Sequence, residues 1–245
     1  MPAAHVKVLQ FAAMNRIRNA FWQISTLLLF AVVLTAAAAD EVEITAEPSH
    51  HLVLENSEVR VFSVSVAPHA ATLMHRHRHD YIFVTLGDTS ISNEVEGRDP
   101  VELKLSDGAT RFATGNFAHI ARNLGDSPFR NVTIEFLQDE KRRTTLSPWK
   151  KDSGEEEFAA GRRKILFVKD GVRVSEVQLS PGGMVRSEGN VPELIVAVTK
   201  VELHSDVGTK GSVEILKAGE VKWVDKSSGI LNTGHDPARL VVLGF

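Results

Sequence analysis

The chain has 245 residues, with 28 Lys and Arg against 31 Asp and Glu and no cysteine. Without cysteine there is no disulfide bond and no thiol chemistry, so an oxidising compartment poses no obstacle to folding. The net charge of −3 counts against nucleic acid as a partner, because binding to a phosphate backbone needs a basic surface.

The first 39 residues have the layout of a secretory signal peptide. They contain no acidic side chain, and their basic residues are Lys7, Arg16 and Arg18. An uncharged stretch with an apolar centre at 27–34 follows, and four alanines end at Ala39. This order predicts cleavage after Ala39, a periplasmic or secreted protein and no stable membrane association afterwards.

Two further features concern this leader. Met14 lies just before the basic pair and would give a more ordinary signal length, which makes Met1 to Ala13 a candidate for a misassigned start. The alternative to cleavage is an uncleaved membrane anchor. Gln23, Ser25 and Thr26 shorten the apolar part below the ~20 residues that a membrane span needs.

The residues after the leader follow a β pattern. Phe62, Val64 and Val66 alternate with small residues up to Pro68, which predicts a half-buried strand over 59–66. Turn sequences separate further short strands that we expect at 81–86, 101–105 and 132–136. No long stretch outside the leader has helical periodicity. The pattern therefore predicts an all-β sandwich or barrel.

The same pattern occurs twice in the chain. Residues 59–68 have a counterpart in 172–181, and residues 123–130 have one in 232–239. Between the copies lies a segment, 139–163, that is crowded with Lys, Arg and Glu. We therefore predict a first domain at 40–138, a charged linker at 139–163 and a second domain at 164–245.

A histidine-rich run precedes the strand expected at 81–86. His75 and His77 are two residues apart, so on an extended strand their imidazoles point to the same face. Arg76 and Arg78 would point to the opposite face. A third imidazole from His119 would complete a metal site in the interior of the barrel.

These residues resemble the two motifs of the cupin superfamily. The first motif has the form G-x5-H-x-H-x3,4-E-x6-G, and His75, His77, Asp80 and Gly87 follow it with Asp80 in the Glu place. The second has the form G-x5-P-x-G-x2-H-x3-N, which Gly108, Gly115, His119 and Asn123 follow with small length changes and without the Pro.

The resemblance is strong from Glu55 to Leu137 and weaker from Lys164 to Phe245. It implies two tandem cupin barrels of the jelly-roll (double-stranded β-helix) type, with a metal held by His75, His77, Asp80 and His119 in the first barrel. One residue fewer than usual separates the histidine pair from Asp80, which leaves two alternatives open. His77 and His79 could be the pair, with Tyr81 on their face. Asp80 could also orient an imidazole instead of binding the metal.

The second repeat lacks the corresponding ligands. At the offset of the repeat, His75 and His77 align with Glu188 and Asn190, His119 aligns with Ser228, and Glu193 aligns with Asp80. A single carboxylate does not hold a transition metal. The second barrel is therefore expected to be degenerate and to act as a packing partner.

Three imidazoles and a carboxylate suit Mn, Fe, Ni, Cu or Zn, and the ligand set alone does not choose among them. The resemblance implies a small oxygen-rich organic molecule as ligand or substrate. If the protein is an enzyme, it implies dioxygenase, decarboxylase or isomerase chemistry. The alternative is a non-catalytic ligand-binding or structural bicupin with an empty site. Both a monomer and a homodimer are compatible with two barrels in one chain.

Overall fold

The structure is a computed structural model, and it describes residues 40–138, 153–187, 191–204, 213–225 and 229–245. These residues form twenty strands and one short 3-10 helix, which confirms the predicted all-β class. The leader predicted at 1–39 lies outside the described residues. Within them, no helix has the length and apolar character that crossing a membrane requires.

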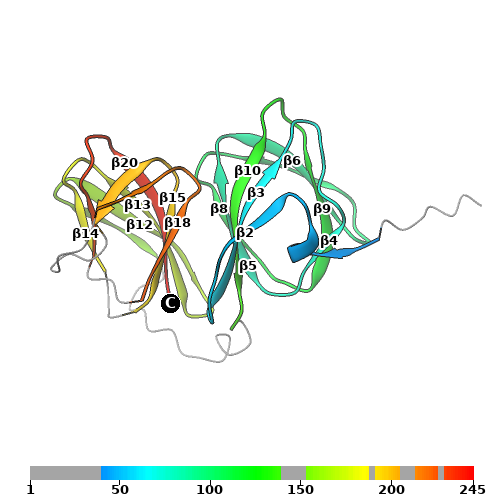
Figure 1. The fold of residues 1–245 in the computed structure, drawn as a ribbon, viewed down its shortest axis with the longest axis horizontal. Helices are drawn as coiled ribbons and strands as arrows, with labels where there is room; N and C mark the ends of the chain where they lie inside the picture. Colours follow the sequence, from blue (N-terminus) through cyan, green and yellow to red (C-terminus); the bar gives the residue numbers. More distant parts are fainter. Residues whose placement is uncertain (1–39, 139–152, 188–190, 205–212, 226–228) are drawn as a thin grey trace, which may run out of the picture. The chain divides into compact units, whose positions relative to one another are not determined.

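The first barrel consists of two five-stranded sheets (Figure 1, blue to green). One sheet has the strand order β1-β4-β9-β6-β7 and the other has the order β2-β3-β10-β5-β8. A 3-10 helix, η1 (Ile44–Ala46), connects β1 to β2. The strands are β1 (Val42–Glu43), β2 (His50–Glu55), β3 (Val59–Val66), β4 (His75–His77), β5 (Tyr81–Leu86), β6 (Thr89–Val95), β7 (Val101–Leu105), β8 (Thr110–Ala113), β9 (Phe117–Asn123) and β10 (Phe129–Phe136).

The second barrel has a six-stranded sheet, β11-β12-β13-β20-β15-β18, and a four-stranded sheet, β14-β19-β16-β17 (Figure 1, yellow to red). Its strands are β11 (Gly154–Phe158), β12 (Gly161–Lys169), β13 (Val172–Leu179), β14 (Met184–Arg186), β15 (Glu193–Ala197), β16 (Val201–His204), β17 (Glu214–Leu216), β18 (Val221–Val224), β19 (Gly229–Asn232) and β20 (Ala238–Gly244).

The predicted strand positions agree closely with the structure. The strands expected at 59–66, 81–86 and 101–105 are β3, β5 and β7, and the one expected at 132–136 is the later part of β10. The predicted linker is too long at its C-terminal end. Residues 154–163, which we assigned to it, form β11 and the start of β12, whereas residues 139–152 lie outside the described part. Three consecutive Glu of β11, residues 155–157, lie opposite the Arg and Lys of β12, residues 162–164. Except for the buried Arg163, these charged side chains are exposed to solvent.

An asparagine performs the same task in each barrel and explains the repeated motif. The Asn123 side-chain amide donates to the carbonyls of Val66, Ala67 and Ser127, and its oxygen accepts from the Gly125 N–H. In the second barrel Asn232 makes the matching set of bonds, which go to Leu179, Ser180, Asp236 and Gly234. Each asparagine therefore joins the end of one strand to the turn that precedes the last strand of its barrel.

Candidate metal centre

Two neighbouring strands of the first barrel bring the predicted histidines together. β4 pairs antiparallel with β9, and His75 lies directly opposite His119. His77 is two residues along β4 and therefore shares the face of His75. All three residues are buried, whereas Arg76 and Arg78 of the same run are bound to Glu41 and Glu43 on the other face. The choice of His75 and His77 as the pair agrees with this arrangement.

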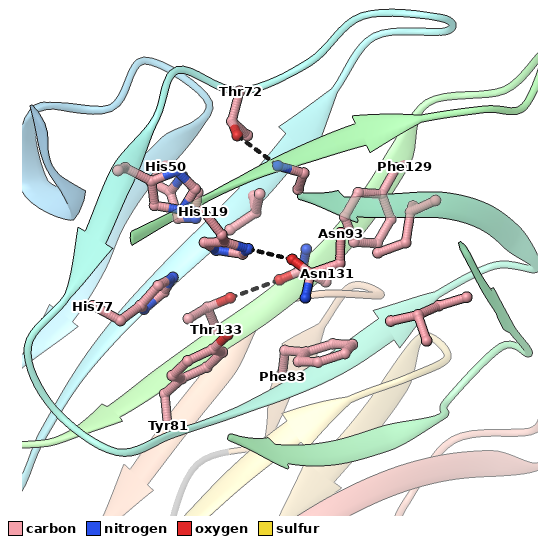
Figure 2. Close-up of a pocket in the computed structure, with 15 residues that line it drawn as sticks. His50, Thr72, His77, Tyr81, Phe83, Asn93, His119, Phe129, Asn131 and Thr133 are labelled. Carbon is pink, nitrogen blue, oxygen red and sulfur yellow. Dashed lines mark hydrogen bonds between the residues drawn. The ribbon is translucent and has the colours of Figure 1, made fainter. Parts of the chain in front are cut away.

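The imidazole rings lie close to one another. The ring centroid of His75 is 4.5 Å from that of His119 and 5.2 Å from that of His77, and His77 is 5.2 Å from His119. A fourth imidazole, His50 of β2, lies 4.7 Å from His75. Figure 2 shows His50, His77 and His119 gathered at one end of the pocket. In the described residues, ligand atoms of His50, His75 and His77 lie within 4.8 Å of one another.

The two nitrogens of these imidazole rings differ in their surroundings. The Nδ1 atoms of three histidines lie at hydrogen-bonding distance from oxygens: His75 from the Leu73 carbonyl at 2.9 Å, His119 from Asn93 Oδ1 at 2.6 Å and His50 from Glu47 Oε2 at 2.6 Å. The Nε2 atoms of His75 and His119 are buried and have no hydrogen-bond partner within the described residues. A buried nitrogen without a partner is costly, and a metal ion would satisfy both.

Burial and mutual repulsion hold these imidazoles in their neutral form. Desolvation, with a smaller contribution from His50, lowers the pKa of His75 to about 4. Desolvation, together with His75 and His50, lowers the pKa of His119 to about 3. The pKa of His77 is lowered well below its usual value, first by desolvation and then by the neighbouring histidines. A neutral imidazole carries the lone pair that a metal ligand needs.

The histidines form one end of a small cavity of about 60 Å³. Figure 2 shows Phe83 and Phe129 away from the histidine end, with Asn93, Asn131 and Thr133 between. Thr133 donates a hydrogen bond to Asn131, and the Tyr81 ring stacks on His77 at 4.0 Å. The described lining contains no carboxylate and is completed by Val64, Thr72, Ile91, Leu103 and Ala121.

Two buried carboxylates stand behind the histidines. Glu47 is only 2% exposed and accepts from His50. Glu135 is 1% exposed, and its Oε1 lies 3.4 Å from His77 Nδ1, while its other oxygen lies 3.7 Å from Arg60. A carboxylate that is hydrogen-bonded to a ligating imidazole, as Glu47 is to His50, fixes its orientation and raises its basicity. His77 Nδ1 has no hydrogen-bond partner within the described residues.

Asp80 does not join the histidines. Its side chain is buried, but it is absent from the cavity lining, and its Oδ1 accepts from the Gly115 N–H at 2.8 Å. Gly115 lies so close to the His79 carbonyl that a Cβ there would approach it to 2.4 Å. Asp80 therefore fixes the loop between β8 and β9 and lies apart from the three imidazoles with which it was predicted to bind the metal. His79, the alternative partner of His77, is likewise absent from the lining.

His50 is the site residue that the sequence interpretation missed. It lies opposite Val64, whose inward position the alternating pattern had predicted. The pairing shifts by one residue between Leu52 and Leu54, because a β-bulge interrupts the β2–β3 hairpin. Extending the register of Glu55 and Arg60 without the bulge would place His51 opposite Val64, so a regular hairpin would have indicated the wrong histidine.

The residues expected to replace the ligands in the second barrel are only partly visible. Glu188, Asn190 and Ser228 lie outside the described residues. Glu193 pairs with Gly244 in the way that Tyr81 pairs with Glu135, so the strand register makes Glu193 the counterpart of Tyr81 and not of Asp80. The alignment was one residue off because it assumed a constant offset through the loop that precedes β15.

Comparisons with known proteins identify the architecture. No family model matches the chain, and no curated protein matches its sequence. Among solved structures, an oxalate decarboxylase from Lactobacillus farciminis in complex with formate aligns with a TM-score of 0.55 at 14% identity, covering 80% of this chain and 83% of that one. AerE from Microcystis aeruginosa aligns with a TM-score of 0.53 at 13% identity, covering 81% and 97%. A cupin 2 conserved barrel domain protein from Leptotrichia buccalis aligns with a TM-score of 0.51 at 10% identity, covering 80% and 87%.

The chain has the two-barrel cupin fold. As in the predicted bicupin, one chain supplies both barrels, and the histidines of the first barrel occupy its interior. The donor set of this cupin site fits a divalent transition metal, because several neutral imidazoles converge on one point and two of them present unpartnered Nε2 atoms. The residues that could hold the metal are His75, His77 and His119, with His50 beside them.

Proposed function

We propose that the first barrel binds one divalent transition metal through His75, His77 and His119, and that the bound metal serves to bind or transform a small oxygen-rich organic molecule. The observation that carries this proposal is the pair of buried, unpartnered Nε2 atoms of His75 and His119 at a cavity wall. A metal ion would satisfy both nitrogens at once, whereas leaving them without a partner would cost free energy.

The donor set narrows the choice of metal. The lining holds imidazoles and lacks a carboxylate, and imidazole ligands suit Fe, Ni, Cu and Zn better than Mn, which prefers oxygen. A metal bound here would act as a Lewis acid toward the oxygens of a ligand or, if it is iron or copper, as a redox centre. The comparison with oxalate decarboxylase concerns the fold and does not select the reaction.

The other wall residues would recognise and orient the ligand. Asn93, Asn131 and Thr133 present amide and hydroxyl groups, which bind oxygen atoms without adding charge. Burial, reinforced by Glu135, raises the pKa of Tyr81, so this residue keeps its proton and is no general base at neutral pH. The cavity of about 60 Å³ is small and enclosed by these side chains, so it suits a small ligand.

Elemental analysis tests the metal site. The chain should be purified without chelator or a nickel column and compared with a His75→Ala/His119→Ala variant and with His69→Ala, an exposed histidine, as the matched control. We expect close to one metal ion per chain in the parent and in the control, and almost none in the double variant. A parent that stays free of metal after reconstitution, or a double variant that retains it, would overturn the proposal.

A non-catalytic bicupin is the second candidate, and one observation favours it. In the described lining no carboxylate is present and Tyr81 keeps its proton, so no general base other than the histidines borders the cavity. Metal-loaded protein that binds small carboxylic acids in calorimetry, yet leaves them unchanged in the presence and absence of O₂, would support a binding protein.

Export belongs to the proposal as well. The basic, apolar and alanine-rich order of residues 1–39 supports a periplasmic or secreted protein. N-terminal sequencing of the protein recovered from the periplasm or medium should start at Asp40. Retention of residues 1–39 in a membrane fraction would favour the anchored alternative.

A further inference from the structure

We propose that His50 is a further ligand of the metal centre, and that Glu47 holds it in place so that metal binding fastens residues 41–50 onto the first barrel. This inference rests on the metal binding proposed above. It assigns a role to a histidine outside the two sequence motifs and to a carboxylate that has no part in them.

The geometry of the Glu47–His50 pair is that of an oriented ligand. Glu47 Oε2 lies 2.6 Å from His50 Nδ1, and the two side chains are 2% and 5% exposed. With Nδ1 engaged, Nε2 is the nitrogen left for a metal. The His50 ring lies 4.7 Å from His75 and 6.2 Å from His77, and the three residues offer ligand atoms within 4.8 Å of one another.

Glu47 also connects His50 to a second ligand. Its Oε1 accepts from the Leu73 N–H at 3.2 Å, and the Leu73 carbonyl lies 2.9 Å from His75 Nδ1. One carboxylate thus positions His50 directly and His75 through a single residue of backbone. The Ser49 N–H donates to Glu47 as well, at 2.8 Å, which fixes the turn that leads into β2.

The segment that carries Glu47 is attached to the same strand as the ligands. β1 pairs in parallel with β4, and Val42 lies opposite His75. On the outer face, Arg76 binds Glu41 and Arg78 binds Glu43 through two hydrogen bonds each. On the inner side, Ile44 is buried in the apolar cluster of the first barrel. A metal held by both His50 and β4 would tie the two ends of this segment to one point.

Co(II) titration of the purified chain, followed by visible absorption, tests the ligand assignment. The d–d bands of Co(II) respond to the number and type of its ligands. The variants are His50→Ala, Glu47→Gln and, as the matched control, His51→Ala, whose side chain is exposed on the same strand. We expect an unchanged spectrum in the control, altered bands and at least about tenfold weaker binding in His50→Ala, and binding weakened about 10- to 100-fold in Glu47→Gln.

Hydrogen exchange of the unmodified chain adds a measurement that does not depend on the folding of a variant. Saturating Zn(II) should slow exchange of the Ser49 and Leu73 amides, which donate to Glu47, by about tenfold or more. If the parent binds Co(II) but His50→Ala gives the same bands and affinity, or if Zn(II) leaves both amides unaffected, this inference is wrong and the metal site stands without His50. If the parent binds no Co(II) at all, the proposed function itself fails.

Discussion

The two barrels of the chain have equivalent strand pairing but differ in the side chains that fill their interiors. Strand pairing gives the equivalences: Val66 lies opposite Phe129 in the first barrel as Leu179 lies opposite Ala238 in the second. By the same register, Asn131 and Thr133 of the first barrel correspond to Leu240 and Val242 of the second. Polar cavity-lining positions in one barrel are thus apolar core positions in the other.

The remaining equivalences follow the same trend. Ala121, two residues before Asn123, corresponds to Ile230, two residues before Asn232, so a larger side chain occupies the space of a smaller one. His50 lies opposite Val64 as Arg163 lies opposite Val177. The buried Arg163 donates to the Arg186 carbonyl at 2.6 Å. An arginine is always charged and cannot ligate a metal, so this single replacement removes the counterpart of His50.

The same strand pairing therefore accommodates a polar interior in one barrel and an apolar cluster in the other. The second barrel closes with an apolar cluster that includes Ile195, Leu203 and Leu240, all fully buried. The first barrel places histidines, asparagine and threonine at its centre, although polar groups stabilise an interior less than close-packed apolar ones. The polar interior of the first barrel agrees with the metal and ligand binding proposed for it.

The largest effect that separates the barrels is the pH dependence of the metal-free protein. His75 and His119 titrate at about 4 and about 3 when folded and near 6.5 when unfolded. Above pH 6.5 both states are neutral, so stability is constant. As pH falls from 6.5 to about 4, the unfolded chain takes up protons that the folded chain refuses, and each histidine lowers the free energy of unfolding by about 1.4 kcal/mol per pH unit.

Urea unfolding of the chelator-treated protein between pH 7 and pH 5 measures this loss. The His75→Gln/His119→Gln variant should have a clearly smaller pH dependence in that window, where carboxylates do not yet titrate, and His77, whose pKa is also lowered, should account for much of what remains. An equal slope in parent and variant would place the sensitive groups elsewhere and break the link between the pH response and the first barrel.

The next largest expected effect is the loss of stability when the asparagine that both barrels have in common is replaced. Asn123→Ala and Asn232→Ala each remove an amide that satisfies three carbonyls and one N–H. We expect each substitution to lower the free energy of unfolding by about 2–4 kcal/mol, because buried backbone groups lose their partners. Chemical denaturation of both variants at pH 7.5 measures the two losses.

The comparison between these two variants is the informative part. Similar losses would show that the motif asparagine is structural in both barrels. If Asn123→Ala abolished metal binding while its stability matched that of the parent, the asparagine would belong to the site and the equivalence with Asn232 would be misleading.

How much of this could be predicted from the sequence depends on the element. Alternation of residue types located β3, and the strict period of two placed His75 and His77 on one face. The resemblance to the cupin motifs added His119, which lies opposite His75 in the structure. Motif position alone suggested Asp80, and the structure uses that carboxylate to fix Gly115. A motif match identifies a residue type at a position. It does not give the direction of a side chain next to the end of a strand, as at Asp80, because that direction depends on the loop.

His50 could not be predicted from the sequence for a different reason. Its register depends on a β-bulge near Val53, and a one-residue shift exchanges His50 for His51. The limits of the linker were also misjudged, because the charged hairpin of β11 and β12 has the composition of a solvated connector. A high content of charged residues indicates that a segment is exposed to solvent, but it does not distinguish an exposed edge strand from a linker.

The smallest expected effect is the most selective test of the comparison. Asn131→Leu/Thr133→Val gives the first barrel the residues that the second barrel has at those positions. Because both members of the Thr133–Asn131 hydrogen bond are replaced together, no buried partner is left behind, and the free energy of unfolding should change by less than about 1 kcal/mol.

The reciprocal exchange, Leu240→Asn/Val242→Thr, places polar groups in a close-packed core and should lower the free energy of unfolding by about 1–3 kcal/mol. Thermal denaturation of both variants, with Co(II) binding measured beside it, separates stability from ligation. A first-barrel variant that keeps its metal and its stability shows that Asn131 and Thr133 are present for the ligand, whereas a loss of several kcal/mol would show that the polar interior is part of the fold.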